Sequence, residues 1–220
     1  MNIVCVKWGT KYGPDYVNKL YSMVQRNMSI DFQFFCYTDD VNGLDSEIHT
    51  IPIESDLVEW WPKIDLLNIM TRGETILFDL DVVILNPLER LCSTKTRTVS
   101  VLYSQWKEGY VQPLAKEKFP TLYNSSIMKW TDKQGQEVYQ YFQKHKQSIL
   151  FKYSGIDRFL FNEQVHVDTL PTSIAYSYWK GVRYLKDTTP EKLRPDYEVC
   201  ILNHGNKQHE LDTWVKDYWK

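Results

Sequence analysis

The stretch TILFDLDVVIL, residues 75–85, decides the fold class. It has the composition of one buried strand, interrupted by the carboxylates of Asp79 and Asp81. A buried unpaired carboxylate is costly, so the pair must lie at a strand end, accept hydrogen bonds or be neutralised by a cation. Residues two apart in an extended chain point to the same face, so both acids can reach one ion, for which oxygen ligands favour Mg²⁺ or Mn²⁺. The alternative is a strand terminus whose acids cap backbone amides.

Strands and helices alternate on the amino-terminal side of this stretch. Apolar, β-branched or aromatic runs predict strands at 3–6, 32–38 and 49–53, and helical spacing predicts helices at 15–26 and 63–70. Such alternation indicates an α/β fold with a mainly parallel central sheet and helices on both of its faces.

The pattern on the carboxyl-terminal side is less regular. Strands are predicted at 98–103 and 125–130, a polar helix from 132 to about 147, and a further strand at the start of the segment 199–207. No repeat or linker divides the sequence, so residues 1–220 are predicted to form one domain.

Composition excludes several classes of protein. The 220 residues carry 26 Lys and Arg against 28 Asp and Glu, and this balance gives no electrostatic footprint for nucleic acid. Four cysteines without a CxxC spacing predict buried thiols in a reducing compartment and argue against a cysteine zinc site. There is no signal peptide and no apolar run long enough for a transmembrane segment, which predicts a soluble cytoplasmic protein, in the host cytoplasm if viral.

The loop of residues 7–15, KWGTKYGPD, follows the first predicted strand directly. In open α/β sheets ligands bind beyond the carboxyl ends of the strands, so this loop is placed to hold a nucleotide, with Trp8 or Tyr12 stacking on a base. The alternative is a plain turn whose glycines relieve backbone strain and whose Asp15 caps the next helix.

Three further segments carry polar groups suited to a sugar nucleotide. His204, Gly205 and Lys207 follow the last predicted strand and offer a nitrogen ligand, a permissive backbone and a positive charge for a diphosphate. Lys63, in the first turn of a helix, opposes the helix dipole and invites an anion. Asn124 and Ser125 offer hydrogen bonds to sugar hydroxyls or satisfy a strand entrance. Aromatic residues that are candidates for an acceptor platform, or equally for core packing, are Trp106, Tyr110, Tyr176, Tyr178 and Trp179.

Taken together, these segments resemble the small GT-A glycosyltransferases that use a sugar nucleotide. The chain is similar to the glycogenin and lipopolysaccharide galactosyltransferase group, and to small glycosyltransferases of bacteria and large DNA viruses. The segments that carry the resemblance, in family order, are IVCVKWGTKYGPDYVNKLY, FFCYTDD, WWPKIDLLN, ILFDLDVVILNPL, YNSSIMKW, SGIDRFLFNE and ILNHGNK. The resemblance implies a single GT-A (nucleotide-diphospho-sugar transferase) domain, with residues 1–90 as the nucleotide-binding half and 91–220 as the acceptor-side half and metal- and phosphate-binding tail.

The resemblance also implies a role for individual residues. Asp79, Asp81 and His204 correspond to ligands of Mn²⁺ or Mg²⁺, and Asp157 to a residue near the anomeric carbon, although Arg158 replaces the Gln that relatives carry next to it. Residues implied at the donor nucleotide are Trp8, Gly9, Thr10, Tyr12, Asp39, Lys63, Asp79, Gly205 and Lys207, and those implied at the acceptor and sugar are Asn124 and Ser125.

The implied activity is transfer of a hexose or deoxyhexose from a UDP-sugar to a hydroxyl of a glycan or glycoprotein. Retention of configuration is expected, with Asp157 stabilising the oxocarbenium-like sugar; if Asp157 instead deprotonates the acceptor, the reaction inverts. Two alternatives stay open at this point. One is a catalytically silent homologue that binds sugar nucleotide or carbohydrate, and the other is a phosphohydrolase with Asp79 as its nucleophile.

Overall fold

The computed structural model describes residues 1–107, 119–163, 165–179, 181, 190–202 and 213–220. The first half contains β1 (Asn2–Lys7), α1 (Pro14–Asn27), β2 (Gln33–Thr38), β3 (His49–Pro52), α2 (Lys63–Ile69), β4 (Glu74–Phe78) and β5 (Val82–Ile84). The rest contains α3 (Glu89–Ser93), β6 (Ser100–Tyr103), β7 (Tyr123–Thr131), α5 (Gln136–Lys152), α6 (Ile156–Asn162), β8 (Asp168–Leu170), β9 (Ala175–Ser177), β10 (Val199–Ile201) and α7 (Thr213–Tyr218). Short 3₁₀ turns occur at Gln105–Lys107, Asp132–Gly135 and Pro190–Asp196.

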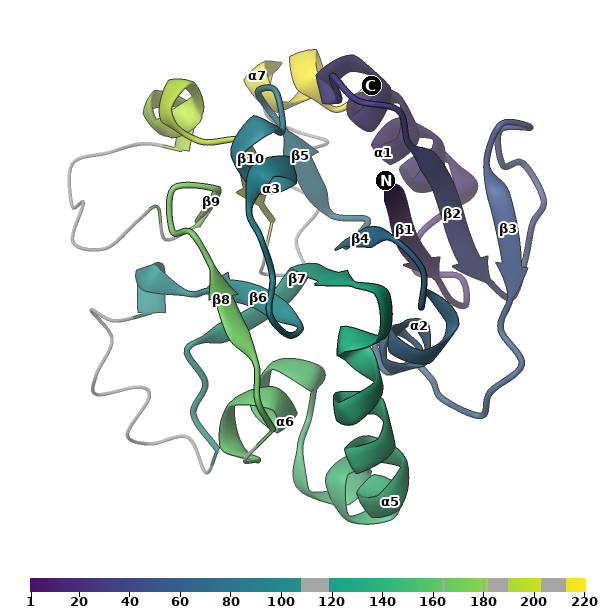
Figure 1. Cartoon of the computed structure of the whole chain (residues 1–220). Coiled ribbons are helices and arrows are strands. Elements are labelled where there is room, and N and C mark those ends of the chain that lie inside the picture. The colour runs from purple at the N-terminus through teal and green to yellow at the C-terminus, as the bar shows by residue number, and fades with distance from the viewer. Residues whose placement is uncertain (108–118, 164, 180, 182–189, 203–212) are drawn as a thin grey trace.

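A seven-stranded sheet in the order β3-β2-β1-β4-β7-β6-β8 forms the centre of the molecule (Figure 1). Every neighbouring pair is parallel except the two that involve β7, which confirms the predicted mainly parallel sheet. The chain builds outward from β1 through β2 to β3 and then returns to the other side of β1 to form β4. Ligands of open α/β sheets bind at such a reversal, beyond the carboxyl ends of the two strands.

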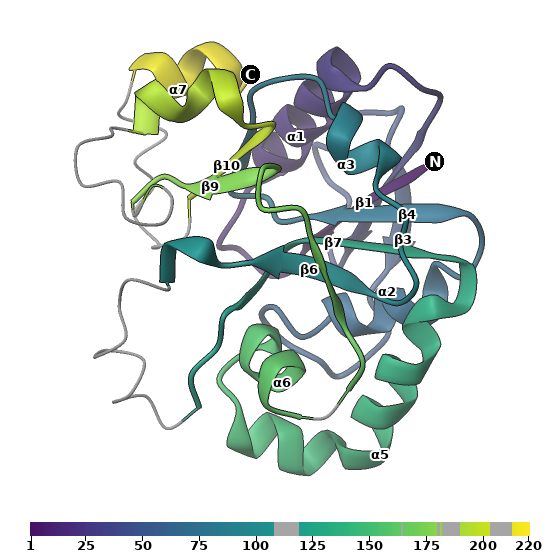
Figure 2. The ribbon, with the colours of Figure 1, turned by 60° about the vertical axis from the view of Figure 1, so that its left-hand side comes forward.

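Alternating residues of each strand enter different cores on the two faces of the sheet. On β1, Ile3 and Cys5 join the core that contains α1, whereas Val4 between them joins the core that contains α2, α5 and α6. Figure 2 shows α1, α3 and α7 on one side of the sheet and α2, α5 and α6 on the other. The expectation of helices on both faces is therefore confirmed.

The stretch 75–85 does not form a single strand, which corrects the prediction. β4 ends at Phe78, residues 79–81 turn, and β5 then joins a separate three-stranded sheet in the order β5-β10-β9. The backbone of this turn is satisfied from two sides, because the Asp79 N–H donates to the Ser126 carbonyl at 2.9 Å and the Leu202 N–H donates to the Asp81 carbonyl at 3.2 Å. The Asp79 and Asp81 side chains are therefore directed by a turn, and not by the two-residue alternation of an extended strand on which the prediction was based.

The structure also decides several smaller points that the sequence left open. Trp106 and Tyr176 are core residues and are not available as a sugar platform, while Tyr110 lies outside the described residues. Asp15 does not cap α1, whose N-cap is Gly13 and which has no side-chain cap. Cys92 is only half-buried, whereas the other three thiols are buried as predicted. Within the described ranges, no helix is both long and apolar enough to cross a membrane.

Candidate functional site

The turn after β4 presents the carboxylate of Asp79 to the first residue of α2. Lys63 Nζ forms an ion pair with Asp79 Oδ1, and the two side chains are 8% and 24% exposed. The same ammonium donates to the Ser125 carbonyl on β7 at 3.4 Å. Lys63 therefore connects α2, the turn after β4 and β7. The sequence predicts an anion beside Lys63, and in this structure that anion is the Asp79 carboxylate.

The second carboxylate of the turn contacts the loop that follows β1. Tyr12 Oη donates to Asp81 Oδ2 at 3.0 Å, and the Tyr12 ring packs on Tyr16 with 4.7 Å between centroids. Burial and the nearby charge of Asp79 raise the pKa of Asp81 to about 6. Burial and the charge of Asp81 raise the pKa of Tyr12 in turn. The loops at the carboxyl ends of β1 and β4 thus meet at the sheet's reversal point, as the topology predicts.

The loop of residues 8–12 is also fixed to the end of β2. Gly9 has a φ of 64°, in the left-handed region that favours glycine, and its N–H donates to Asp39 Oδ2 at 2.9 Å. Trp8 is half-buried and Thr10 is exposed on this loop. These residues, which were predicted at the nucleotide, therefore lie on one loop held between two carboxylates, Asp39 and Asp81.

Asp157 approaches the start of β7 from α6, of which it is the second residue. Its Oδ1 accepts a hydrogen bond from the Ser125 N–H at 2.8 Å. Asn124 is buried beside it, and its Oδ1 accepts from the Ser126 N–H at 3.1 Å. A continuous series of contacts therefore leads from Asp157 through Ser125 and Lys63 to Asp79.

The donor set at the turn fits a hard divalent cation. Asp79 and Asp81 lie two residues apart on this turn, and Asp79 is paired with Lys63. Burial, followed by the charge of Asp79, raises the pKa of Asp81. Carboxylate oxygens are the ligands that Mg²⁺ and Mn²⁺ prefer. Over the described part of the chain, no group of three His, Cys, Asp or Glu residues is arranged to hold a metal. His204, Gly205 and Lys207 lie outside the described residues.

The sequence analysis did not identify Asp65, whose hydrogen bonds hold the helix turn that carries Lys63. Asp65, two residues further along α2, is buried, and its Oδ2 accepts from Tyr37 Oη at 3.2 Å and from Ser55 Oγ at 2.6 Å. These bonds fix the first turn of α2 against β2 and the preceding loop. The signal available in the sequence was an acid in the otherwise apolar helix KIDLLNI.

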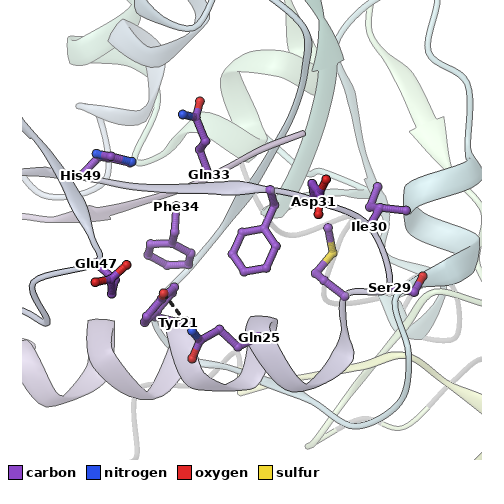
Figure 3. A pocket seen from close by; sticks show the side chains of 11 residues that line it. Tyr21, Gln25, Ser29, Ile30, Asp31, Gln33, Phe34, Glu47 and His49 are labelled. Atoms are coloured by element: carbon purple, nitrogen blue, oxygen red, sulfur yellow. Dashed lines mark hydrogen bonds between the residues drawn. The ribbon is translucent and has the colours of Figure 1, made fainter.

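A separate hollow of about 650 Å³ lies between α1 and the beginnings of β2 and β3 (Figure 3). Tyr21 and Phe34 meet edge to face within it, with 5.3 Å between ring centroids. Its lining residues are Tyr21, Gln25, Met28, Ser29, Ile30, Asp31, Phe32, Gln33, Phe34, Glu47 and His49. None of the residues predicted at the donor, acceptor or metal is among them, because the hollow is at the strands' amino ends.

The sequence matches no known family model and no curated protein, whereas solved structures resemble the fold. A galactosyltransferase LgtC, solved in complex with donor and acceptor sugar analogs, matches with a TM-score of 0.64 and 10% identity, over 100% of this chain and 97% of its own. A glycosyltransferase involved in glycosylation of the major capsid of PBCV-1 matches with a TM-score of 0.55 and 10% identity, over 99% and 100%. Mouse xyloside xylosyltransferase 1 matches with a TM-score of 0.52 and 10% identity, over 92% and 98%.

These likenesses extend over nearly the whole of this chain and of the proteins it matches. At 10% identity they establish the architecture and leave the chemistry to be argued from the site. The chain has the GT-A fold of these glycosyltransferases.

Proposed function

We propose that this protein is a metal-dependent glycosyltransferase that moves a hexose or deoxyhexose from a UDP-sugar to a hydroxyl of a glycan or glycoprotein, with retention. The observation that carries this proposal is the connected set of contacts among Tyr12, Asp81, Asp79, Lys63 and Ser125 at the reversal point of a GT-A sheet. Acidic, basic and aromatic groups meet there at the place where an α/β sheet binds nucleotides.

Residues 1–90 supply the nucleotide side in this proposal. The loop carrying Trp8, Gly9, Thr10 and Tyr12 offers an aromatic face to the base, and Asp39 at the end of β2 accepts hydrogen bonds from the nucleoside. Lys63 exchanges its contact with Asp79 for one with the diphosphate, which it reaches from the same position on α2.

The metal and diphosphate side joins the carboxylate turn to the carboxyl-terminal segment. Asp79, Asp81 and His204 would hold Mn²⁺ or Mg²⁺, which when bound neutralises the diphosphate as it leaves. Gly205 and Lys207 approach the same diphosphate in the proposal. The Leu202 N–H bond to the Asp81 carbonyl supports it, because His204 follows Leu202 by two positions in the sequence.

Residues 91–220 supply the sugar and acceptor side. The Ser125 N–H holds the Asp157 carboxylate, which stabilises positive charge developing at the anomeric carbon. In the proposal, Asn124 and Ser125 contact hydroxyls of the transferred sugar. Retention requires the acceptor to approach from the face that the diphosphate leaves, so the leaving phosphate can accept the acceptor proton.

The test is a titration of the purified full chain with UDP, GDP or dTDP, with and without Mn²⁺. The melting temperature of the protein is measured at each ligand concentration. We expect a stabilisation that needs both UDP and Mn²⁺, because a ligand of the native state raises its stability. UDP-sugars are then screened for UDP release with and without candidate acceptors. Asp81→Asn should abolish the metal-dependent shift, while Asp168→Asn, an acid on β8 paired with the exposed Arg97, serves as the matched control.

Three results would redirect the proposal. A shift with UDP-sugars but no release in any assay assigns the chain to the silent binding homologues. Release of phosphate from a phosphomonoester, lost in Asp79→Asn, assigns it to the phosphohydrolases. An Asp81→Asn variant that stays folded and keeps the full Mn²⁺ response removes the carboxylate turn from the site.

A further inference from the structure

Two adjacent tryptophans before α2 have opposite environments. Trp61 is 6% exposed and stacks on Phe142 with 5.6 Å between centroids, so it meets the packing needs of this segment. Trp60 is 42% exposed. Its indole therefore leaves a substantial aromatic face open to a ligand, and its surroundings decide which ligand fits.

The backbone just before Trp60 is strained in a way that produces this arrangement. Glu59 has a φ of 59°, a left-handed conformation that is unfavourable for a non-glycine residue. Glu59 lies inside a turn in which the Trp61 N–H donates to the Val58 carbonyl at 3.1 Å, and the Lys63 N–H donates to the Trp60 carbonyl at 3.4 Å. Strained residues of this kind cluster where a side chain must be held in a functional position.

Trp60 lies against the segment that carries Asp157. A Cβ built on Gly155 would be 3.4 Å from Trp60 Nε1, so the indole lies close to the backbone two residues before Asp157. Trp60 also precedes Lys63 by three positions in the sequence. The Lys63 ammonium meets the Ser125 carbonyl, and the Ser125 N–H meets Asp157. Trp60 therefore lies next to the segment that carries Asp157, the residue that the proposed function assigns to the transferred sugar.

We infer that the exposed face of Trp60 is an acceptor subsite that stacks on an uncharged pyranose ring of a glycan. Indole faces pack well on the apolar face of a sugar ring, because the ring's C–H groups are apolar while its hydroxyls point to the rim. This inference rests on the proposed transferase function and specifies its acceptor side.

The charges around Trp60 select the class of glycan. Glu54 and Glu59 are exposed on the same loop, and Asp56 is paired with Lys146. Glu54 and Glu59, which have no ion-pair partner among the described residues, can accept hydrogen bonds from sugar hydroxyls, and they repel sialylated, sulfated or phosphorylated rings. The subsite therefore favours neutral hexoses and N-acetylhexosamines over anionic sugars.

The experiment measures glycan binding directly, with the wild-type chain in the presence of Mn²⁺ and UDP. Lactose, maltose, N,N′-diacetylchitobiose and 3′-sialyllactose are titrated while ligand NMR saturation transfer and tryptophan fluorescence are followed. We expect binding of at least one neutral disaccharide and weaker binding of sialyllactose. Trp60→Ala should lower the affinity for the neutral disaccharide by about tenfold. Trp60→Phe keeps an aromatic face and should retain most of this affinity.

Phe151→Ala is the matched control, because Phe151 is an aromatic side chain that is 95% exposed on α5 and has no part in the site. Its sugar affinity should equal that of the wild type. Absence of any neutral disaccharide binding, equal affinities for Trp60→Ala and wild type, or a preference for sialyllactose would each overturn the inference. The UDP- and Mn²⁺-dependent stabilisation of Trp60→Ala is measured in parallel: if it is intact, a failed sugar result concerns the subsite alone, and if wild type lacks it, the proposed function fails.

Discussion

Replacing Lys63 by Met tests the electrostatics of the site most directly, because Met keeps much of the apolar stem and removes only the charge. Removing one partner of a fully buried ion pair costs about 3–5 kcal/mol. The Asp79 side chain is 24% exposed and can recover some hydration, so we expect a loss of about 2–3 kcal/mol. For a chain of this length that corresponds to a melting temperature lower by roughly 5–10 °C. Denaturant unfolding of both proteins without metal measures the difference.

The same substitution should change metal and nucleotide binding in opposite directions. A positive charge close to a divalent cation opposes its binding, and Coulomb's law puts the repulsion of two such neighbouring charges at about 1 kcal/mol even in water, which is roughly tenfold in affinity. Lys63→Met should therefore bind Mn²⁺ alone about tenfold more tightly and bind UDP in the presence of Mn²⁺ more weakly.

The control for this prediction is Lys146→Met, which removes a surface pair with the 80% exposed Asp56. Such pairs contribute about 0–1 kcal/mol, so its stability and its Mn²⁺ affinity should stay close to those of the wild type. If Lys63→Met were as stable as the wild type and its Mn²⁺ affinity were unchanged, the charge of Lys63 would not act on the carboxylate turn and the reasoning would be refuted.

Two more substitutions test neighbouring contacts. Tyr12→Phe removes the hydroxyl that orients Asp81 and should weaken Mn²⁺ binding by about tenfold. The affinity is measured by paramagnetic resonance of free Mn²⁺. Unchanged binding would mean that the hydrogen bond from Tyr12 does not orient the Asp81 carboxylate. Glu163 accepts hydrogen bonds from Tyr153 and Lys152, among others, which lower its pKa to about 2. The folded state therefore binds fewer protons than the unfolded state, and the stabilisation is present above about pH 4.5 and lost toward pH 2. Glu163→Gln should cost about 1 kcal/mol at pH 7, since water screens the carboxylate, and should differ little from wild type near pH 2; a cost independent of pH would contradict the assignment.

The fold was predictable because its determinants are local in the sequence. Alternation of apolar residues in β1 and helical spacing in α1 give the element types, and their order gives the parallel sheet. The division of residues 75–85 was not predictable in this way. Val82–Ile84 leaves the main sheet because it pairs with Val199–Ile201, a partner more than a hundred positions away that no local pattern identifies.

The candidate site was predictable in its residue types and less so in its contacts. A DxD pair in an apolar run and a Lys at the start of a helix are visible anomalies, and the structure places Lys63 and Asp79 in contact. The bond from Tyr12 to Asp81 depends on how the loops after β1 and β4 converge, which is a tertiary property. The same holds for Trp106 and Tyr176, whose aromatic rings suit a sugar site or a core equally well, and tertiary packing places them in the core.

The partners of the two carboxylates reduce the cost of placing two acids on one partly buried turn. Lys63 neutralises Asp79, and the Tyr12 hydroxyl satisfies one oxygen of Asp81, so neither acid is left buried without a partner. Moving Lys63 from Asp79 toward a nucleotide's diphosphate would leave two adjacent carboxylates facing a third anion. In the proposed function, an anionic nucleotide alone is therefore a poor ligand, because the charge it needs from Lys63 is taken from Asp79. A divalent cation on the carboxylate turn removes this conflict, since it neutralises the acids and frees the ammonium for the donor at the same time.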